Sequence, residues 1–455
     1  MARTLQRRTV GGTNIPPTSQ LKVKLSPTGR AFWASTGVAS TIYRRIWNGT
    51  EYATPSGAND ASPTLIVAWT ADETYQVAIG RVATTTTTIF LRSFDITTGA
   101  NVLLNTVSNV LNNGTGVLGI ERISGDTFIA STQTRLCVFR IDRGTNTIVV
   151  LSDIAAPMTT IRGIAASGND NIIIVHSGAS DAENGLQSYS VDLSTGVLSS
   201  IGTKYIPGDG RINGFDFRAG KVLTHSFYNL LNVLYLQLNG SDALEVVPGF
   251  NATTLQNNMD AAGAQNTTSF IHLGFNEEEI TYLDQTNDAT FWSANQSTLT
   301  KSTSFTPPPD IPTGATNGRQ NGALASRLYA SYSDDGKVMA VTFWTAAALQ
   351  GVYVYAEYDE VTAEFVAAVP MADAIVTASV NESAQIVADV PMATARVDLV
   401  KNSTVQLIAS VPMAEAFVDA DNTISSQLIA DVPMVDVFIR DQGPRKGGIM
   451  VVQAI

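Results

Sequence analysis

Short alternations of apolar and polar residues, each closed by a polar turn, fill the first three quarters of the sequence. An alternation of period two predicts β-strands, because successive side chains of a strand point to opposite faces of the sheet. Many of these strands are rich in aromatic residues and run directly into Asn-Gly or Thr-Gly turns, a pattern that predicts β-hairpins. Seven such segments occur, at residues 42–49, 94–99, 138–144, 189–196, 234–240, 291–295 and 352–359.

A second recurring piece, a polar turn followed by an apolar strand, lies upstream of the hairpins, for example at 124–130 and 333–341. One four-stranded propeller blade takes about 40–50 residues. We therefore expect an all-β fold with a seven-bladed β-propeller over 21–363, stretched by irregular inserts at 251–268 and 306–322. A β-sandwich or two stacked domains are the alternatives, although neither needs one pattern repeated seven times. The spacing is given by successive turn glycines at intervals of 50, 45, 52 and 44 residues, namely Gly49, Gly99, Gly144, Gly196 and Gly240.

A sharper repeat follows the hairpins. The tripeptide Val-Pro-Met occurs four times, each copy 21 residues after the last. Apolar positions alternate on both sides of each proline, and their phase shifts by one residue there. Because proline cannot donate to a central ladder and would break a helix, each copy predicts two short strands bent at Pro-Met. The repeated pairs are Pro370 and Met371, Pro391 and Met392, Pro412 and Met413, and Pro433 and Met434.

The four copies, at residues 364–441, predict a small β module, and residues 442–455 form a C-terminal tail. One 21-residue copy cannot bury its apolar face alone, so neighbouring copies or other chains must cover it. Two arrangements are open: a small β-solenoid or sheet within one chain, or a stalk in which subunits interwind. Because four copies make a small core, we favour an oligomer in which the repeated Pro and Met residues are assembly positions.

Composition narrows the classes of partner. The chain has 455 residues, of which 44% are hydrophobic and 15% charged, and this length allows a large core. Its net charge of -12 argues against a nucleic-acid-binding body. The single cysteine, Cys137, cannot form an intrachain disulfide. We expect no signal peptide and no membrane span, because neither an apolar leader nor a run of about 18 apolar residues is present.

Residues 1–20 are polar and contain two prolines, which predicts an extended N-terminal arm ahead of the first blade. The arm carries Arg3, Arg7 and Arg8. In a chain of net charge -12, these arginines suit an arm that anchors on an acidic neighbouring subunit. A solvated tail is the simpler alternative.

Candidate chemistry is sparse. His176 and His225 each lie five residues after a turn, so we expect them at the same strand position of neighbouring blades, near the central channel. A structural, half-buried position explains them as well, since no metal-binding spacing and no cysteine pair accompanies them. The acidic segments 277–279 and 334–335 are predicted to be turns. We therefore predict no catalytic residue, no metal ligand and no cofactor, and retain the two histidines as candidates for a channel site.

Low charge, β repeats rich in Thr, Asn and Gly, one cysteine, a polar arm and tandem Val-Pro-Met copies together resemble the virion proteins of tailed bacteriophages. This architectural resemblance implies a non-enzymatic appendage of the tail, a fibre or the capsid surface, which displays a propeller. It also implies other virion subunits as partners, a homo-oligomer, a host-surface glycan or protein as ligand, and a virion location after synthesis in the host cytoplasm.

The alternative function is a propeller enzyme, lactonase-like or glycan-cleaving, with its site in the central channel. The turn near residue 333 and the strand–Asp-x-x-Thr-Gly hairpins are similar to those of lactonase-type propellers. The repeated Ser-x-Asp-x-Gly-x-x-Trp turn of sialidases and the Gly-His…Trp-Asp signature of WD propellers do not occur. Convergence of polar residues in the channel would favour the enzyme, whereas high-order self-association would favour the virion component.

Overall fold

The computed structural model divides the chain into two compact units, Met1–Glu357 and Tyr358–Ile455, here called unit 1 and unit 2. The sequence placed this border near residue 363. The structure describes residues 3–10, 22–35, 42–55, 64–81, 87–111, 117–156, 160–166, 168, 170–178, 185–205, 214–225, 234–263, 268–273, 279–284, 290–302, 305–306, 316–317, 330–344, 351–357, 361–367, 371–379, 382–388, 392–400, 404–409, 413–420, 425–430, 436–441 and 450–454.

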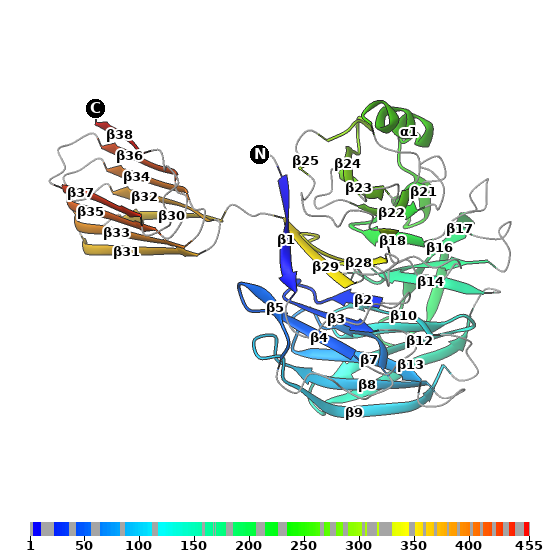
Figure 1. The fold of residues 1–455 in the computed structure, drawn as a ribbon. Helices are drawn as coiled ribbons and strands as arrows, with labels where there is room; N and C mark the ends of the chain where they lie inside the picture. The colour runs from blue at the N-terminus through cyan, green and yellow to red at the C-terminus, as the bar shows by residue number, and fades with distance from the viewer. Residues whose placement is uncertain are drawn as a thin grey trace. The chain divides into compact units, whose positions relative to one another are not determined.

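Unit 1 consists mainly of antiparallel sheets whose strands follow one another in the sequence (Figure 1). The first sheet contains β2 (Lys22–Leu25), β3 (Ala31–Ser35), β4 (Ile42–Trp47) and β5 (Glu51–Ala53), and the second contains β6 (Thr64–Trp69), β7 (Tyr75–Arg81), β8 (Thr87–Phe94) and β9 (Asn101–Val110). The third contains β10 (Val117–Ser124), β11 (Thr127–Thr132), β12 (Arg135–Asp142) and β13 (Thr147–Ala155), and the fourth contains β14 (Ile161–Ala166), β15 (Ile172–Ser177), β16 (Gly185–Val191) and β17 (Leu198–Tyr205).

The later sheets of unit 1 have the same antiparallel order. The fifth contains β18 (Gly214–Arg218), β19 (Lys221–His225), β20 (Tyr235–Leu238) and β21 (Leu244–Val246), and the sixth contains β22 (Thr268–Leu273), β23 (Glu279–Asp284) and β24 (Thr290–Asn295). The last contains β27 (Ala330–Tyr332), β28 (Val338–Trp344) and β29 (Gly351–Glu357), and the two-residue strands β25 (Phe305–Thr306) and β26 (Thr316–Asn317) pair with β1 (Arg3–Val10) and β28, respectively.

The first strands of successive sheets lie beside one another. β6 contacts β10, β10 contacts β14, β14 contacts β18 and β18 contacts β22, while β2 contacts both β6 and β27. A set of short antiparallel sheets with neighbouring inner strands is the arrangement of a β-propeller. The described part of unit 1 is therefore mostly β, with several four-stranded sheets, and is consistent with the propeller expected from the sequence.

The expectation of an irregular insert at 251–268 was wrong in part, because residues Ala252–Ala261 form the helix α1. The side chain of Asn251 caps this helix by accepting a hydrogen bond of 2.9 Å from the backbone N–H of Thr254. Leu255 and Met259, spaced by one helical turn, are fully buried against the sheets. The helix signal was an N-cap followed by two apolar residues four positions apart.

The N-terminal segment is a strand of unit 1 instead of a free arm. β1 (Arg3–Val10) pairs antiparallel with β29, with Leu5 opposite Glu357, and then parallel with β5, with Val10 opposite Tyr52. It thereby joins the last sheet of unit 1 to the first. The physical reason is that β29 and β5 would otherwise expose unpaired backbone groups, and the alternating Arg3–Val10 segment satisfies them.

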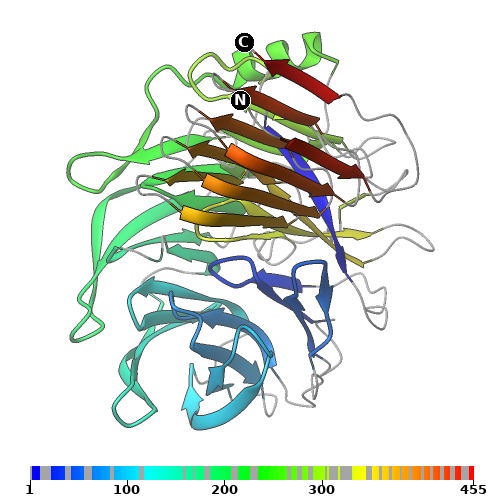
Figure 2. The ribbon, with the colours of Figure 1, turned by 90° about the vertical axis from the view of Figure 1, so that its left-hand side faces the viewer.

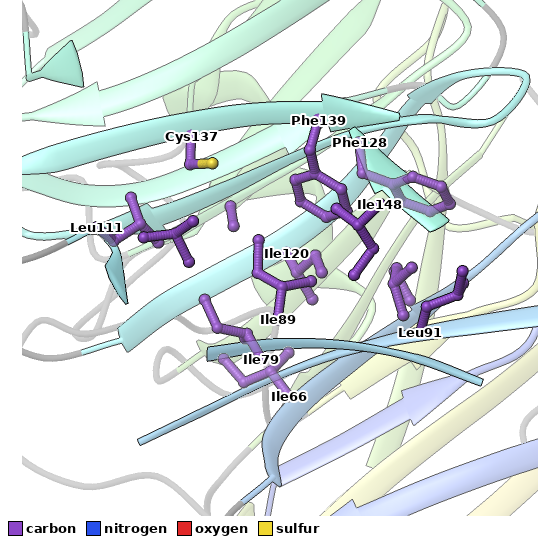
Figure 3. Packing of buried hydrophobic residues seen from close by; sticks show 14 of the residues in the cluster. Ile66, Ile79, Ile89, Leu91, Leu111, Ile120, Phe128, Cys137, Phe139 and Ile148 are labelled. Atoms are coloured by element: carbon purple, nitrogen blue, oxygen red, sulfur yellow. The ribbon is translucent and has the colours of Figure 1, made fainter. Parts of the chain in front are cut away.

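The hydrophobic core lies between neighbouring sheets. One cluster joins β6, β7 and β8 to β10, β11 and β12, and Figure 3 shows its side chains meeting between the two sheets. The rings of Phe128 and Phe139 stack there with centroids 5.7 Å apart. A further cluster joins Val338 and Val354 of the last sheet to Val23 of the first. Each such side chain contributes about 1.5–3 kcal/mol by its burial.

Unit 2 consists of parallel strands in two sheets, which the chain visits in turn (Figure 2 shows these strands, orange to red, side by side). The larger sheet contains β30 (Val361–Ala367), β32 (Glu382–Ala388), β34 (Thr404–Ala409), β36 (Ser425–Ala430) and β38 (Met450–Ala454), and the smaller contains β31 (Met371–Ser379), β33 (Met392–Val400), β35 (Met413–Ala420) and β37 (Asp436–Asp441).

The pairing of unit 2 follows the 21-residue period. Met371 lies opposite Met392, and Met392 lies opposite Met413. The last pairing departs from the period, because Ser426 lies opposite Met450, 24 residues further on. The described strands of both sheets thus pair within a single chain, whereas the sequence favoured the oligomeric of the two arrangements. The residues Pro370, Pro391, Pro412, Pro433 and Met434 lie outside the described residues.

Candidate functional site at the linked turns of unit 1

The histidines selected from the sequence lie on second strands of their sheets. His176 of β15 faces Gly163, and His225 of β19 faces Gly214, so the two positions correspond in their sheets. His176 is 1% exposed, and its ring meets that of Phe215 edge-on with centroids 6.1 Å apart. Because Phe215 belongs to the first strand of the next sheet, His176 packs between two sheets. Of His225 the structure describes the backbone.

The arginines of the N-terminal segment lie against aromatic residues of unit 1. The guanidinium carbon of Arg8 lies 4.5 Å from the ring centroid of Trp47, and that of Arg7 lies 4.6 Å from the ring of Tyr353. These are cation–π distances. Nη1 of Arg8 also donates to the hydroxyl of Tyr52 at 3.4 Å. For Arg3 the structure gives its backbone pairing, opposite Phe305.

Residues from several sheets meet at the turns between first and second strands. The turns after β2, β6 and β27 share one design, in which a hydroxyl accepts a hydrogen bond from the backbone N–H five residues later. Ser26 accepts from Ala31 at 3.1 Å, and Thr70 accepts from Tyr75 at 3.1 Å. Ser333 does the same with Val338 at 2.9 Å. Short hydroxyl side chains favour such turns because they replace backbone partners.

Glu73 breaks the common design of these turns. In all three turns the fourth residue has a positive φ. This residue is glycine in two of them, Gly29 with φ of 70° and Gly336 with φ of 71°, but in the third it is Glu73, with φ of 58°. A residue with a Cβ in this conformation costs roughly 1–2 kcal/mol. Glu73 is only 3% exposed, and its carboxylate accepts from the backbone N–H of Thr28 at 2.6 Å and from its hydroxyl at 2.8 Å. The strained position therefore serves to link the second sheet to the first.

Further bonds connect sheets that are not neighbours. Lys24 of β2 forms an ion pair of 2.9 Å with Glu121 of β10, past the intervening β6. Arg122 of β10, whose side chain is 7% exposed, pairs with Asp334 of the turn before β28. Together with a contact of Arg218 described below, these bonds link residues of five sheets. We call these residues the turn cluster: Lys24, Thr28, Glu73, Glu121, Arg122, Arg218, Asp334 and Asp335.

Two hydrogen bonds to backbone carbonyls complete the turn cluster. The N–H of Asp334 donates to the carbonyl of Pro27 at 2.7 Å, and Nη2 of Arg218 donates to the carbonyl of Asp335 at 2.5 Å. A Cβ at Gly336 would collide with the guanidinium of Arg218, so a larger residue would displace that side chain, and the φ of 71° independently favours glycine here. The segment 333–336 is therefore held from three sides by residues distant in sequence.

The electrostatics of the turn cluster are nearly balanced within it. Burial raises the pKa of Asp334 above its ordinary value, although the positive charges of Arg122 and Lys24 act in the opposite direction. Chemically, two of the four carboxylates of the cluster, Glu121 and Asp334, are each paired with a cation. The turn at 333–336 is recognisable in the sequence, but its partners are not, because Arg122 and Arg218 lie 212 and 117 positions away from the residues they bond.

Other reactive groups lie elsewhere. Cys137 is fully buried, and this burial raises the pKa of its thiol to about 12, so the group stays protonated at neutral pH. Within the described ranges, no group of three or more His, Cys, Asp or Glu side chains is placed to hold a metal ion. No helix in the described part of the chain combines the length and apolarity needed to cross a membrane.

Comparisons with known proteins gave likenesses of structure alone. No family model matches the sequence, and no curated protein matches it. A protein from Lactobacillus plantarum shares 13% identity over 64% of this chain and 84% of its own, with a TM-score of 0.46. A putative 6-phosphogluconolactonase from Bacteroides fragilis shares 13% identity over 71% of this chain and 88% of its own, with a TM-score of 0.44.

The β-propeller domain of Cps50 (Swd1) from Myceliophteria thermophila is similar over 76% of this chain and 98% of its own, with 10% identity and a TM-score of 0.47. At such identities the likenesses concern the fold and carry no activity, substrate or partner to this chain. The propeller interpretation of unit 1 therefore rests on its own sheets, on the contacts between their first strands and on the clusters that join each sheet to the next.

Proposed function

We propose that the chain is a non-enzymatic structural protein of a bacteriophage virion, an appendage in which unit 1 is displayed and unit 2 joins copies. Within this proposal, unit 1 has seven blades, the last of which is formed by β27, β28, β29 and β1. The ligand is a host-surface glycan or protein, and the other partners are virion subunits and further copies of the chain. The protein is made in the host cytoplasm and resides in the virion.

The observation that carries the proposal is the joining of a closed unit to an open one. In unit 1, β1 pairs with both the last and the first sheet. In unit 2, strands add at a fixed 21-residue step, and the pairing of each sheet stops at its outermost described strand. A closed unit suits presentation of a stable surface, whereas open sheet edges suit pairing with further chains.

A cell-binding assay tests the display part of this proposal. The labelled full-length chain and the fragment 1–357 are incubated with panels of bacterial cells and with arrays of surface glycans. We expect saturable binding by both, with stronger apparent binding by the full chain because joined copies bind multivalently. Equal binding by both, or binding by neither across cells and glycans, would count against an appendage that displays unit 1.

One observation favours a second candidate, a propeller enzyme. The turn cluster brings Glu121 and Asp334 together with two cations, which is the convergence of polar residues expected of a catalytic channel. The full chain should then hydrolyse members of a panel of lactones and glycosides, and Glu121→Gln should abolish turnover in a protein whose circular dichroism spectrum shows that it is still folded. Our proposal expects no turnover above that of the Glu121→Gln variant.

A further inference from the structure

The first and second sheets of unit 1 pack against each other, and the layer between them contains polar as well as apolar side chains. Its apolar part is a cluster to which both sheets contribute: Ala31, Trp33 and Ile46 from the first, and Val67, Trp69, Ala78, Phe90 and Phe94 from the second. Successive side chains of a strand alternate between the two faces of its sheet. Arg44, Gln76 and Arg92, each two positions from a cluster member on the same strand, therefore lie in the same layer.

The register places the polar residues of this layer beside one another. In the second sheet, Gln76 lies opposite both Trp69 of β6 and Arg92 of β8, so the three side chains form one row across the sheet. In the first sheet, Trp33 lies opposite Arg44. Residues directly opposite in such pairs have Cβ atoms about 4.5–5.5 Å apart. All five residues are buried, with exposed fractions between 1% and 5%.

Three hydrogen-bond donors of this layer lack an acceptor. Within the described part of the chain, the indole N–H groups of Trp33 and Trp69 and the side-chain amino group of Gln76 are buried and have no hydrogen-bond partner. The amide oxygen of Gln76 is already used, because Asn101 donates to it at 3.1 Å. Buried donors in folded proteins normally have a partner, since an unmade hydrogen bond costs free energy. Three such donors in one layer indicate that an acceptor binds between the two sheets.

The charge of the surrounding strands favours an acceptor that is negative. The five strands that supply this layer, β3, β4, β6, β7 and β8, contain four arginines and no aspartate or glutamate. Two of the arginines, Arg44 and Arg92, lie in the layer itself. Nη1 of Arg44 reaches across to the second sheet, where it donates to the carbonyl of Gly99 at 3.4 Å. Buried positive charge is stabilised by a nearby negative charge.

We propose that a halide anion, such as chloride, binds in this layer and accepts hydrogen bonds from Trp33, Trp69 and Gln76. Indole, amino and guanidinium N–H groups only donate, so an anion can accept from all of them, whereas a water molecule would also need acceptors for its own two hydrogens. A single atom suits a layer packed at the density of a protein interior. A halide is favoured over sulfate or phosphate because the cost of removing an ion from water grows with its charge.

The bound anion accepts from both sheets, so it stabilises the contact between the first sheet, which β1 also holds, and the second. A ligand that binds only the folded chain raises its stability with concentration. The stability of unit 1 should therefore depend on the halide concentration. This inference is independent of the assembly role proposed for unit 2.

Thermal unfolding of the full-length chain at constant ionic strength tests the proposal. Tryptophan fluorescence follows unit 1, because all five tryptophans lie within it. Sodium chloride replaces sodium gluconate stepwise up to about 0.5 M, and gluconate is too large for the layer. We expect the melting temperature to rise saturably by about 3 °C as chloride replaces gluconate. Equal melting temperatures in the two salts would overturn the proposal.

The test variant is Trp69→Phe, which keeps an aromatic ring and removes one of the three donors. It should weaken the apparent affinity for chloride at least about tenfold. The matched control is Trp292→Phe, which removes another buried indole N–H without a partner in the described part of the chain, in the sixth sheet. The control should keep the chloride response of the wild type. A response that Trp69→Phe retains in full, or that the control loses equally, would overturn the proposal.

A second variant, Gln76→Glu, supplies the negative charge covalently. Its carboxylate can still accept from Asn101 and stands in the row between Trp69 and Arg92. We expect the chloride response to disappear, and the melting temperature in gluconate to equal or exceed that of the wild type in gluconate. A Gln76→Glu chain that responds to chloride as the wild type does would also overturn the proposal.

Discussion

Units 1 and 2 are both made of short β-strands, but they differ in whether strand pairing connects the last sheet back to the first. Unit 1 returns to its start, because β1 pairs with β29 of the last sheet and with β5 of the first. Unit 2 is linear, and its pairing runs from β30 to β38 in one sheet and from β31 to β37 in the other. Closure removes sheet edges and makes a unit self-sufficient, whereas a linear stack can always accept another strand.

The two units also differ in how their sequences specify pairing. In unit 1 the sheets have unlike sequences but similar turns, such as those of Ser26, Thr70 and Ser333. In unit 2 the sequence itself recurs, and residues 21 positions apart lie opposite each other. Antiparallel hairpins are specified by local turn chemistry, whereas parallel strands need matching side chains in register. The comparison predicts that disturbing a closing strand matters more than disturbing any single turn.

Deletion of residues 3–10 should have the largest effect on unit 1. The deletion leaves β29 and β5 without the strand that joins them, and several kilocalories per mole of pairing and packing are lost. Since about 1 kcal/mol shifts the melting temperature by roughly 2–4 °C in a large domain, we expect a decrease above about 10 °C or insolubility. Differential scanning calorimetry measures it, with deletion of Ala2 as the control. An unchanged melting temperature would show that closure by β1 is dispensable.

The substitution Phe139→Ala should destabilise unit 1 by about 3–5 kcal/mol, because it opens a cavity in a fully buried cluster. Urea unfolding followed by tryptophan fluorescence would measure the loss. The mass of the assembled chain below the transition should stay the same, because unit 2 does not contribute to this cluster. Val102→Ala is the control: its side chain is 58% exposed, so the change should be within about 0.5 kcal/mol.

Removal of one charge from the turn cluster should have an intermediate effect. Arg122→Met leaves Asp334 without its ion-pair partner in a partly buried site, and we expect a loss of about 1–3 kcal/mol. Asp334→Asn in the same background should recover part of this loss, since the unpaired charge is then removed. A double-mutant cycle by chemical denaturation measures the coupling. Fully additive losses would mean that the pair does not hold the turn.

The smallest effect should come from a hairpin turn. Hydrogen bonds from the side chain and N–H of Ser194 lower the pKa of Asp192 to about 2. Because the pKa is lower in the folded chain, the turn is stabilised above the ordinary pKa near 4, and this stabilisation is lost as pH falls towards 2. Asp192→Asn should flatten the pH dependence of the melting temperature between pH 4 and 2, with little change at pH 7.

The corresponding turns support this substitution, because asparagine already occupies them at Asn239 and Asn295, where it accepts from the N–H of Ser241 and of Ser297 at 3.0 and 2.9 Å. Asp95→Asn, in another turn of this type with a lowered pKa, should behave in the same way. An Asp192→Asn variant whose pH dependence equals that of the wild type would contradict the assignment of this titration to the turn.

The elements that could be predicted from the sequence were those with a local signal. The turn at 333–336 and the hairpin turns at 95–99 and 192–196 were recognisable because Asp, Gly and Thr act within a few residues. The repeat spacing of unit 2 was readable because the sequence recurs. The role of residues 3–10 was not, because a polar alternating strand at the chain end has the same composition as a solvated arm.

The turn cluster could not be predicted for a related reason. Glu73 occupies a position that glycine takes in the two similar turns, and only its bond to Thr28 explains it. The pairing of Arg122 with Asp334 spans most of unit 1. A single sequence does not reveal contacts of this range, whereas local spacing does place His176 and His225 at corresponding strand positions.

In the proposed function, unit 2 joins copies of the chain and unit 1 does not. Multi-angle light scattering of the full chain and of the fragment 1–357, both at about 100 μM, tests it most directly. We expect a mass of at least two chains for the full-length protein and of one chain for the fragment, which should keep a cooperative unfolding transition. Two monomers, or a fragment that associates as strongly as the full chain, would contradict it.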